Sequence, residues 1–287
     1  MGACGSEGGG EVSGGVSGVV KWPLRTMLKS KPLRAKLIYE IGTLHYADLN
    51  FAIPIGNGLV APVTAAEHLT SFEEIFFTDE YALLDQLPTP RRWLDLGCHA
   101  GYFSLKILSR RRAKGIKEPP EALLVDADSR SRIAVERLIQ LNGLQNQMQH
   151  RHAAIAAKGE TVAFVERSCM SSSLAGSIRA EPASTVPVLT AQQIVTSLRP
   201  PYDLIKIDVE GAEHDFFTAY SLVVQQAKAI LLEWHSWHTG GGGFGQLHEL
   251  LGRSGFRLQS PPEEGRETSW EGKPARCGLA LFVRAST

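Results

Sequence analysis

Short apolar runs alternate with segments of helical spacing from Pro90 to the end of the chain. Over residues 134–141, for example, apolar side chains recur at i, i+4 and i+7, as on one face of a helix. Strands that alternate with helices form a parallel sheet through right-handed crossovers. The sequence therefore predicts an α/β fold with a mostly parallel sheet and helices on both faces. The strand-like runs are Trp93–Leu96, Ala122–Val125, Leu204–Ile207, Ala229–Leu232 and Leu279–Val283.

The 287 residues include 30 basic and 30 acidic side chains, and 43% of them are hydrophobic. This composition can fill the core of one large α/β domain or of two small ones. The even charge gives no general case for nucleic-acid or anionic-membrane binding. No apolar run approaches the roughly 20 residues that span a bilayer, and no secretory leader is visible. The four cysteines form no CxxC pair, so we expect a cytoplasmic protein without structural zinc or disulfides.

Three segments are predicted along the chain. Residues 1–18 are rich in Gly, Ser and Glu and should be disordered. Their first six residues also fit an N-myristoylation pattern, so a lipidated or a plain flexible terminus remains open. Residues 19–90 should form an N-terminal extension on the substrate side, and residues 91–287 the α/β domain. Within the extension we expect helices over 19–45, a hairpin turned at 56–58 and an amphipathic helix over 71–87.

A glycine-containing loop, residues 95–101, follows the first strand of the α/β domain. Gly97 and Gly101 let the backbone turn tightly, so that a ligand can approach the N-terminus of the next helix. The loop is not a GxGxxG motif and carries no Walker lysine, which disfavours a pyrophosphate ligand. Taken alone, it could also be a strand-to-helix turn that happens to use glycine.

The second strand ends in an acidic residue, Asp126. At this point of a Rossmann-like unit an acidic side chain typically accepts hydrogen bonds from ribose hydroxyls. Asp128 follows closely, but it or Ser129 fits the N-cap of the next helix instead. Asp126 is therefore the stronger candidate for a ribose contact.

The run from Tyr202 to His214 begins as a buried strand and then gathers three carboxylates and a histidine within seven residues. Burying a carboxylate costs several kcal/mol unless it is paired or faces a cleft. Ligands of parallel α/β sheets bind at the carboxyl ends of the strands. We therefore expect Asp208 and Glu210 at the open end of a strand, beside a ligand. Glu213 could instead stabilise the next helix N-terminus, and Lys206 should be ion-paired or snorkelling.

Five motifs in this order make the chain resemble the FkbM-type methyltransferases, a branch of the class I S-adenosylmethionine-dependent enzymes. The resemblance runs from about Phe72 to His235. It implies a Rossmann-like seven-stranded, mostly parallel sheet and methyl transfer to a hydroxyl oxygen, often on a sugar or a polyketide-like natural product. The motifs are WLDLG at 93–97, GYFSL at 101–105, Asp126 followed by LNGL at 141–144, SSSL at 171–174, and KIDVEGAE at 206–213.

The resemblance also implies a set of residues that bind S-adenosylmethionine. Asp95, Gly97 and Gly101 would line its methionine end, Asp126 would hold the ribose, and Ala154 would lie near the adenine. Family members usually have Gly-Ala-Asn-x-Gly in the first loop, whereas this chain has Cys98 and His99 in the Ala and Asn places. A histidine can still donate to the methionine carboxylate, so we expect cofactor binding to be retained.

Methyl transfer to a hydroxyl requires an in-line acceptor oxygen and a group that removes its proton. The candidate bases are Asp208, Glu210 and His235, which follows the fifth strand and has a pKa type that suits proton removal near neutrality. Alternatively, Asp208, Glu210 and Glu233 could bind a divalent cation that orients the acceptor, although the spacing does not demand it.

The acceptor pocket is predicted to form from residues 19–90 and 234–275. Trp234 and Trp237 precede a run of glycines that would suit a lid or a solvated linker. Arg110, Arg111 and Arg112 are interpreted as a solvated helix end rather than an RNA site.

Two other functions compete with an O-methyltransferase that acts on a small-molecule or saccharide hydroxyl. A nicotinamide-dependent oxidoreductase is disfavoured by the missing GxGxxG motif. A non-catalytic cofactor-binding module should have lost its acidic strand ends, yet Asp126, Asp208 and Glu210 are present. The sequence does not identify the acceptor itself.

Overall fold

The computed structural model describes residues 50–166, 173–174, 183–237, 243–260, 265–270 and 273–285. The predictions for residues 1–49, for most of the SSSL motif and for the glycines at 240–242 lie outside the described residues. Within the described residues, no helix combines the length and apolar character that a membrane span requires.

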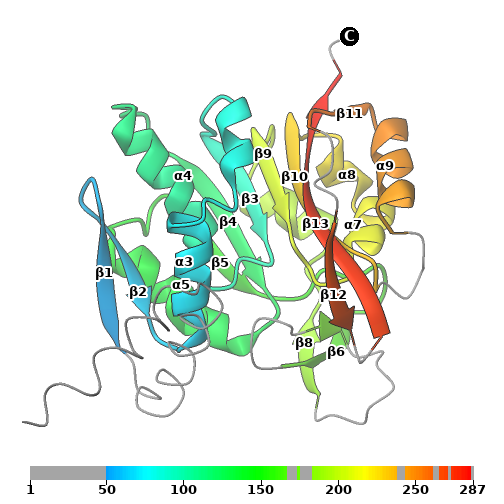
Figure 1. Cartoon of the computed structure of the whole chain (residues 1–287), viewed down its shortest axis with the longest axis horizontal. Coiled ribbons are helices and arrows are strands. Elements are labelled where there is room, and N and C mark those ends of the chain that lie inside the picture. Colours follow the sequence, from blue (N-terminus) through cyan, green and yellow to red (C-terminus); the bar gives the residue numbers. More distant parts are fainter. Residues whose placement is uncertain are drawn as a thin grey trace, which may run out of the picture.

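A central sheet of seven strands in the order β11-β13-β10-β9-β3-β4-β5 forms the middle layer of the molecule (Figure 1). The five strands from β10 to β5 run parallel, whereas β13 runs antiparallel to both β10 and β11. The prediction of a seven-stranded, mostly parallel sheet is thereby confirmed. An additional strand, β12 (Arg266–Trp270), pairs with β13. The seven strands are β3 (Arg92–Leu96), β4 (Glu121–Asp126), β5 (Met148–His152), β9 (Leu204–Ile207), β10 (Ala229–His235), β11 (Phe256–Leu258) and β13 (Lys273–Arg284).

Two hydrophobic cores lie on opposite faces of this sheet, because successive side chains of a strand point to opposite faces. In β3, for example, Trp93 belongs to one core and Leu94 to the other. The first core contains helices α4 (Tyr102–Ala113) and α5 (Ser129–Leu141). The prediction that helices cover both faces is confirmed. The helices of the second core are α6 (Ala191–Ser197), α7 (Glu213–Ala219), α8 (Ser221–Val224) and α9 (Gly243–Arg253).

The described part of the N-terminal extension packs into the first core. Its hairpin pairs β1 (Phe51–Gly56) with β2 (Leu59–Val63), as the turn signal predicts. The expected single helix over 71–87 is divided into α3 (Glu67–Phe76) and a 3-10 helix, η1 (Ala82–Gln86). The division lies at Asp79, whose φ of 55° is incompatible with a continuing α-helix.

The arginines at the end of α4 bind backbone carbonyl groups, so the interpretation of a solvated helix end is wrong for Arg111. Its side chain is buried, and its guanidinium donates to the carbonyl oxygens of Pro90 at 2.7 Å and Glu118 at 2.6 Å. Arg110 and Arg112 donate to carbonyl oxygens of the N-terminal extension. This run therefore fastens the extension to the α/β domain.

A second, three-stranded sheet lies beside the lower end of the main one (Figure 1). Its strands are β6 (Thr161–Val165), β7 (Ser173–Leu174) and β8 (Ser184–Pro187). Ala154, just past β5, forms an isolated bridge with Val188. The small sheet therefore stands next to the carboxyl end of β5.

A buried histidine in α3 predicts a pH-dependent stability. His68 is 1% exposed, and its Nδ1 accepts a hydrogen bond from the Thr64 N–H at 3.2 Å. Burial, with the nearby His99, lowers the pKa of His68 to about 3. The folded chain thus binds fewer protons than the unfolded chain, in which this pKa is about 6.5. The stabilising contribution is complete above about pH 6.5 and is lost as the pH falls toward 3.

We expect the unfolding free energy to fall by up to about 1.4 kcal/mol per pH unit from this group between pH 6 and 5. Urea unfolding of the wild type and of His68→Gln at pH 7, 6 and 5 measures the slope. The variant should show a shallower fall, whereas His248→Gln, on the exposed side of α9, should keep the wild-type slope. Equal slopes in all three proteins would show that His68 is not responsible.

Candidate functional site

A cavity of about 370 Å³ lies between the carboxyl ends of the central parallel strands and the N-terminal extension. Its lining includes residues from the ends of β3, β4, β9 and β10, from α3 and from β12. Most of the candidate residues from the sequence meet here. They are Gly97, His99, Asp126, Ala154, Asp208, Glu210, Glu233 and His235.

The loop after β3 approaches the loop after β9 so closely that only glycine fits. Gly97 has a φ of 74°, and a Cβ placed on it would lie 1.6 Å from the carbonyl oxygen of Asp208. His99, two residues after Gly97, also has a positive φ, of 48°. Its N–H donates to Asp126 Oδ2 at 2.6 Å, which ties this loop to the end of β4.

Asp126 is held in place by backbone donors at the cavity wall. Besides the His99 N–H on Oδ2, its Oδ1 accepts from the N–H of Asp128 at 2.8 Å. Burial raises the pKa of Asp126, and these two backbone hydrogen bonds oppose the effect. Each carboxylate oxygen can accept a second hydrogen bond. The predicted N-cap role of Asp128 is confirmed, since its side chain accepts from the Arg130 N–H at the start of α5.

The imidazole of His99 turns toward the N-terminal extension. Its Nδ1 lies 3.0 Å from Ser71 Oγ, and its Nε2 lies 4.0 Å from Glu67 Oε1. Ser71 and Glu67 belong to α3 and also line the cavity. The structure therefore places this side chain at the junction of α3 with the loop after β3.

Asp95 and Gly101 do not line the cavity. Asp95 is fully buried in β3, where its Oδ2 accepts from Ser104 Oγ at 2.7 Å and its Oδ1 lies 3.8 Å from Lys206 Nζ. Gly101 lies just before α4 with a φ of 77°, and a Cβ there would meet Leu138 at 3.2 Å. Both residues support the loop from behind: Asp95 through buried polar contacts, and Gly101 through close packing of α4 on α5.

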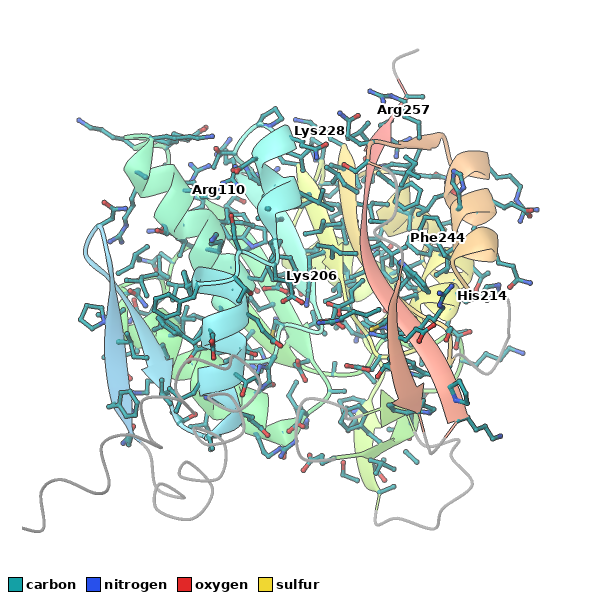
Figure 2. The ribbon with its side chains drawn as sticks, in the orientation of Figure 1. Arg110, Lys206, His214, Lys228, Phe244 and Arg257 are labelled. Carbon is teal, nitrogen blue, oxygen red and sulfur yellow. The ribbon has the colours of Figure 1, made fainter. Side chains whose placement is uncertain are left out.

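Lys206 is a buried cation beneath the cavity, at the centre of the molecule (Figure 2). It is ion-paired, one of its two predicted states: Nζ donates to Asp208 Oδ2 at 3.0 Å and to the Gly97 carbonyl oxygen at 2.6 Å. Burial alone would lower the pKa of Lys206, but the neighbouring carboxylates of Asp208 and Asp95 raise it above its usual value. The lysine therefore stays charged and joins β9 to the loop after β3.

The acidic residues near the ends of β9 and β10 gather around His235. The His235 Nδ1 lies 2.7 Å from Glu213 Oε1, and its Nε2 lies 3.8 Å from Glu210 Oε2. Burial alone would lower the pKa of His235, but Glu213 and the other carboxylates raise it well above its usual value. Burial raises the pKa of Glu210 to about 8 and also raises that of Glu233. Glu213 lies in the first turn of α7 and thus serves both the helix and His235.

Several lining residues were not singled out from the sequence. Arg266, on β12, lies 3.7 Å from Glu233 and 4.0 Å from Glu80. Trp270, also on β12, stacks on Trp237 with ring centroids 4.8 Å apart and an interplanar angle of 4°. Both β12 residues lie in segment 234–275, which is predicted to contribute to the pocket. Their sequence does not single them out, because only the pairing of β12 with β13 brings these side chains to the cavity.

Part of the chain matches a known protein family. Residues 118–258 match the family model of the methyltransferase FkbM domain, which is just under half of the chain. The matched segment includes Asp126, Asp208, Glu233 and His235. Among curated proteins, no sequence matches this chain.

Two solved structures are reported among those similar to this chain. The magnesium protoporphyrin IX methyltransferase of Synechocystis PCC 6803 with bound S-adenosylmethionine has a TM-score of 0.43 and 14% identity, over 92% of this chain and 96% of that one. The O-methyltransferase of Bacillus cereus in complex with S-adenosylhomocysteine has a TM-score of 0.40 and 12% identity, over 91% and 96%.

The contact between Gly97 and Asp208 predicts a sharp difference between two glycine substitutions. Gly97→Ala should lower the unfolding free energy by about 3 kcal/mol or more and abolish cofactor binding, because the new methyl overlaps a backbone carbonyl. Gly143→Ala has a similar φ of 66° but no atom within 4 Å, so it should cost about 1–2 kcal/mol from backbone strain alone. Thermal melting and calorimetry with S-adenosylhomocysteine measure both effects. Equal losses in the two variants would contradict the role of the close approach.

Proposed function

We propose that this S-adenosylmethionine-dependent methyltransferase, whose residues 118–258 match the methyltransferase FkbM domain, methylates a hydroxyl oxygen. The acceptor is a small molecule or a saccharide-like compound. The observation that carries this proposal is that two groups of residues form two walls of the same cavity. One wall contains Gly97 and Asp126, and the other contains Asp208, Glu233 and His235.

The cofactor lies along the first wall in this proposal. Its ribose hydroxyls donate to Asp126, whose oxygens can each accept one hydrogen bond beyond those from the backbone. The adenine lies near Ala154, which lines the same cavity. The methionine end extends past Gly97 toward the N-terminus of α4, where free N–H groups and the helix dipole favour a carboxylate. His99 contributes its backbone position, since its imidazole faces α3.

The methyl group then faces the carboxylates at the ends of β9 and β10. The acceptor oxygen attacks the methyl carbon in line with the carbon–sulfur bond, whose electron pair stays on sulfur to give S-adenosylhomocysteine. The hydroxyl proton passes to a carboxylate. Asp208 suits this role because Lys206 fixes its position. His235 suits it less well, because Glu213 favours the protonated imidazole by raising its pKa; Glu210 would act only as the pH approaches its pKa of about 8.

The acceptor side combines aromatic and acidic surfaces, which supports a polyhydroxylated acceptor. Trp237 and Trp270 stack on each other and line the cavity together with Glu80 and Glu233. Indole rings bind the apolar face of a sugar ring, and carboxylates accept hydrogen bonds from its hydroxyls. Pockets of this kind obtain affinity from the apolar surface and orientation from a few polar groups.

Calorimetry with S-adenosylhomocysteine tests the cofactor assignment. The wild type should bind this nucleoside and should not bind NAD, for which the first loop lacks the GxGxxG motif. Asp126→Ala should weaken binding by about 10- to 100-fold, the effect of about 1.4–2.7 kcal/mol expected for lost hydrogen bonds to a charged group. Asp85→Ala, whose carboxylate is exposed on η1, should bind as the wild type does. Unchanged affinity in Asp126→Ala would refute the ribose contact.

A further inference from the structure

One nitrogen of His235 is aimed at the cavity without a hydrogen bond. The side chain is 3% exposed, and its Nδ1 is engaged by Glu213 at 2.7 Å. Among the described residues, Nε2 has no hydrogen-bond partner, and the Glu210 oxygen at 3.8 Å is too distant to form one. A histidine that donates one ring N–H to a carboxylate can bind a metal ion through its other nitrogen, which releases its proton when the ion binds.

Two carboxylates form a compact set of possible ligand atoms with a ring nitrogen of His235, and Nε2 is the nitrogen that Glu213 leaves open. Asp208, Glu233 and His235 each offer one atom, and these three atoms all lie within 4.8 Å of one another. Glu233 and His235 are two residues apart on β10, so they point to the same face of the sheet. Asp208 follows the neighbouring strand β9. Two adjacent strands therefore hold the set, which differs from the sequence-based one by having His235 in place of Glu210.

The charges of the cavity point to a cation. Its lining contains eight carboxylates but only three Lys or Arg side chains. Lys206 and Arg266 are the two cations on the acceptor side, and Arg130 lies near Asp128 on the other side. S-adenosylmethionine brings one net positive charge, which is too little to balance the remaining carboxylates. Burying such a surplus of like charge is unfavourable, so the carboxylates take up either protons or a bound cation. A divalent ion among them would replace those protons.

We propose that Asp208, Glu233 and His235 Nε2 bind a divalent transition-metal ion such as Mn²⁺, and that its open positions hold the acceptor hydroxyl. The imidazole ligand favours a transition-metal ion over Ca²⁺ or Mg²⁺, which prefer oxygen ligands alone, and the two carboxylates suit Mn²⁺ among such ions. Lys206 holds one oxygen of Asp208, so the other is the ligand. The site itself is independent of the reaction, but its use in catalysis rests on the proposed methyl transfer.

A bound ion would change the acceptor chemistry in two ways. As a Lewis acid it makes a coordinated hydroxyl more acidic. Because Asp208 is then a ligand, the proton leaves to Glu210, which lines the same cavity, or to water. It also fixes the oxygen in front of the methyl group, since two of the ligands belong to one rigid strand. The carboxylate of Glu213 then acts as a positioning residue that orients His235.

Binding of Mn²⁺ alone to the full-length, chelator-treated protein tests the site directly. Electron paramagnetic resonance should show one bound ion per chain, and its pulsed form should show coupling to one imidazole nitrogen. Glu233→Gln and Asp208→Asn should each weaken binding at least about tenfold, and Glu213→Gln should weaken it by about 10- to 100-fold through the lost histidine partner. Glu74→Gln, a cavity residue outside the set, should bind within about twofold of the wild type.

Calorimetry with S-adenosylhomocysteine on the same variants separates folding and cofactor binding from metal binding. Variants that bind the nucleoside normally but lose Mn²⁺ support the site. Absence of Mn²⁺ binding by the wild type, or binding that Glu233→Gln leaves unchanged, overturns it. If the nucleoside binds and methyl transfer proceeds after chelation, the catalytic use of the metal fails while the proposed function stands.

Discussion

The Lys206 ammonium lies buried between strands β9 and β3. The geometry of the cavity depends on the side chains and carbonyl group that this ammonium binds. Asp95 and Lys206 are register partners on β3 and β9, and the lysine also bonds the Gly97 carbonyl and Asp208. Ser104 and Trp93 extend this chain of contacts from Asp95 toward α4. A buried charge must keep its partners. The floor of the cavity is therefore one continuous polar network.

The walls above this floor depend on backbone conformations that ordinary residues adopt rarely. His99 and Glu210 both have positive φ, of 48° and 49°, and both line the cavity on neighbouring loops. Such strain costs of order 1–3 kcal/mol per residue and persists where the surrounding structure imposes it. Here the imposed contacts are the His99 N–H on Asp126 and the Gly97 loop on Asp208. The two loops thus hold each other in place.

Sequence patterns predict the parts of this molecule that local chemistry decides. The apolar runs of β3, β4, β9 and β10 are continuous because both faces of a parallel sheet are buried, so their order and ends are readable. The acidic residues can be identified because they directly follow these apolar runs. The contacts of Asp95 with Ser104 and of Gly101 with Leu138 are not readable, since strand register and helix packing decide them. Arg266 and Trp270 come from a strand defined only by its pairing with β13.

A crystal structure with bound S-adenosylhomocysteine tests the central claim, that one cavity holds the methyl donor and presents it to the carboxylates of β9 and β10. We expect ribose hydroxyls within hydrogen-bond distance of Asp126 and a sulfur atom that faces Asp208, Glu233 and His235. A nucleoside bound outside this cavity, or one reversed so that its adenine lies against Trp237 and Trp270, would contradict it.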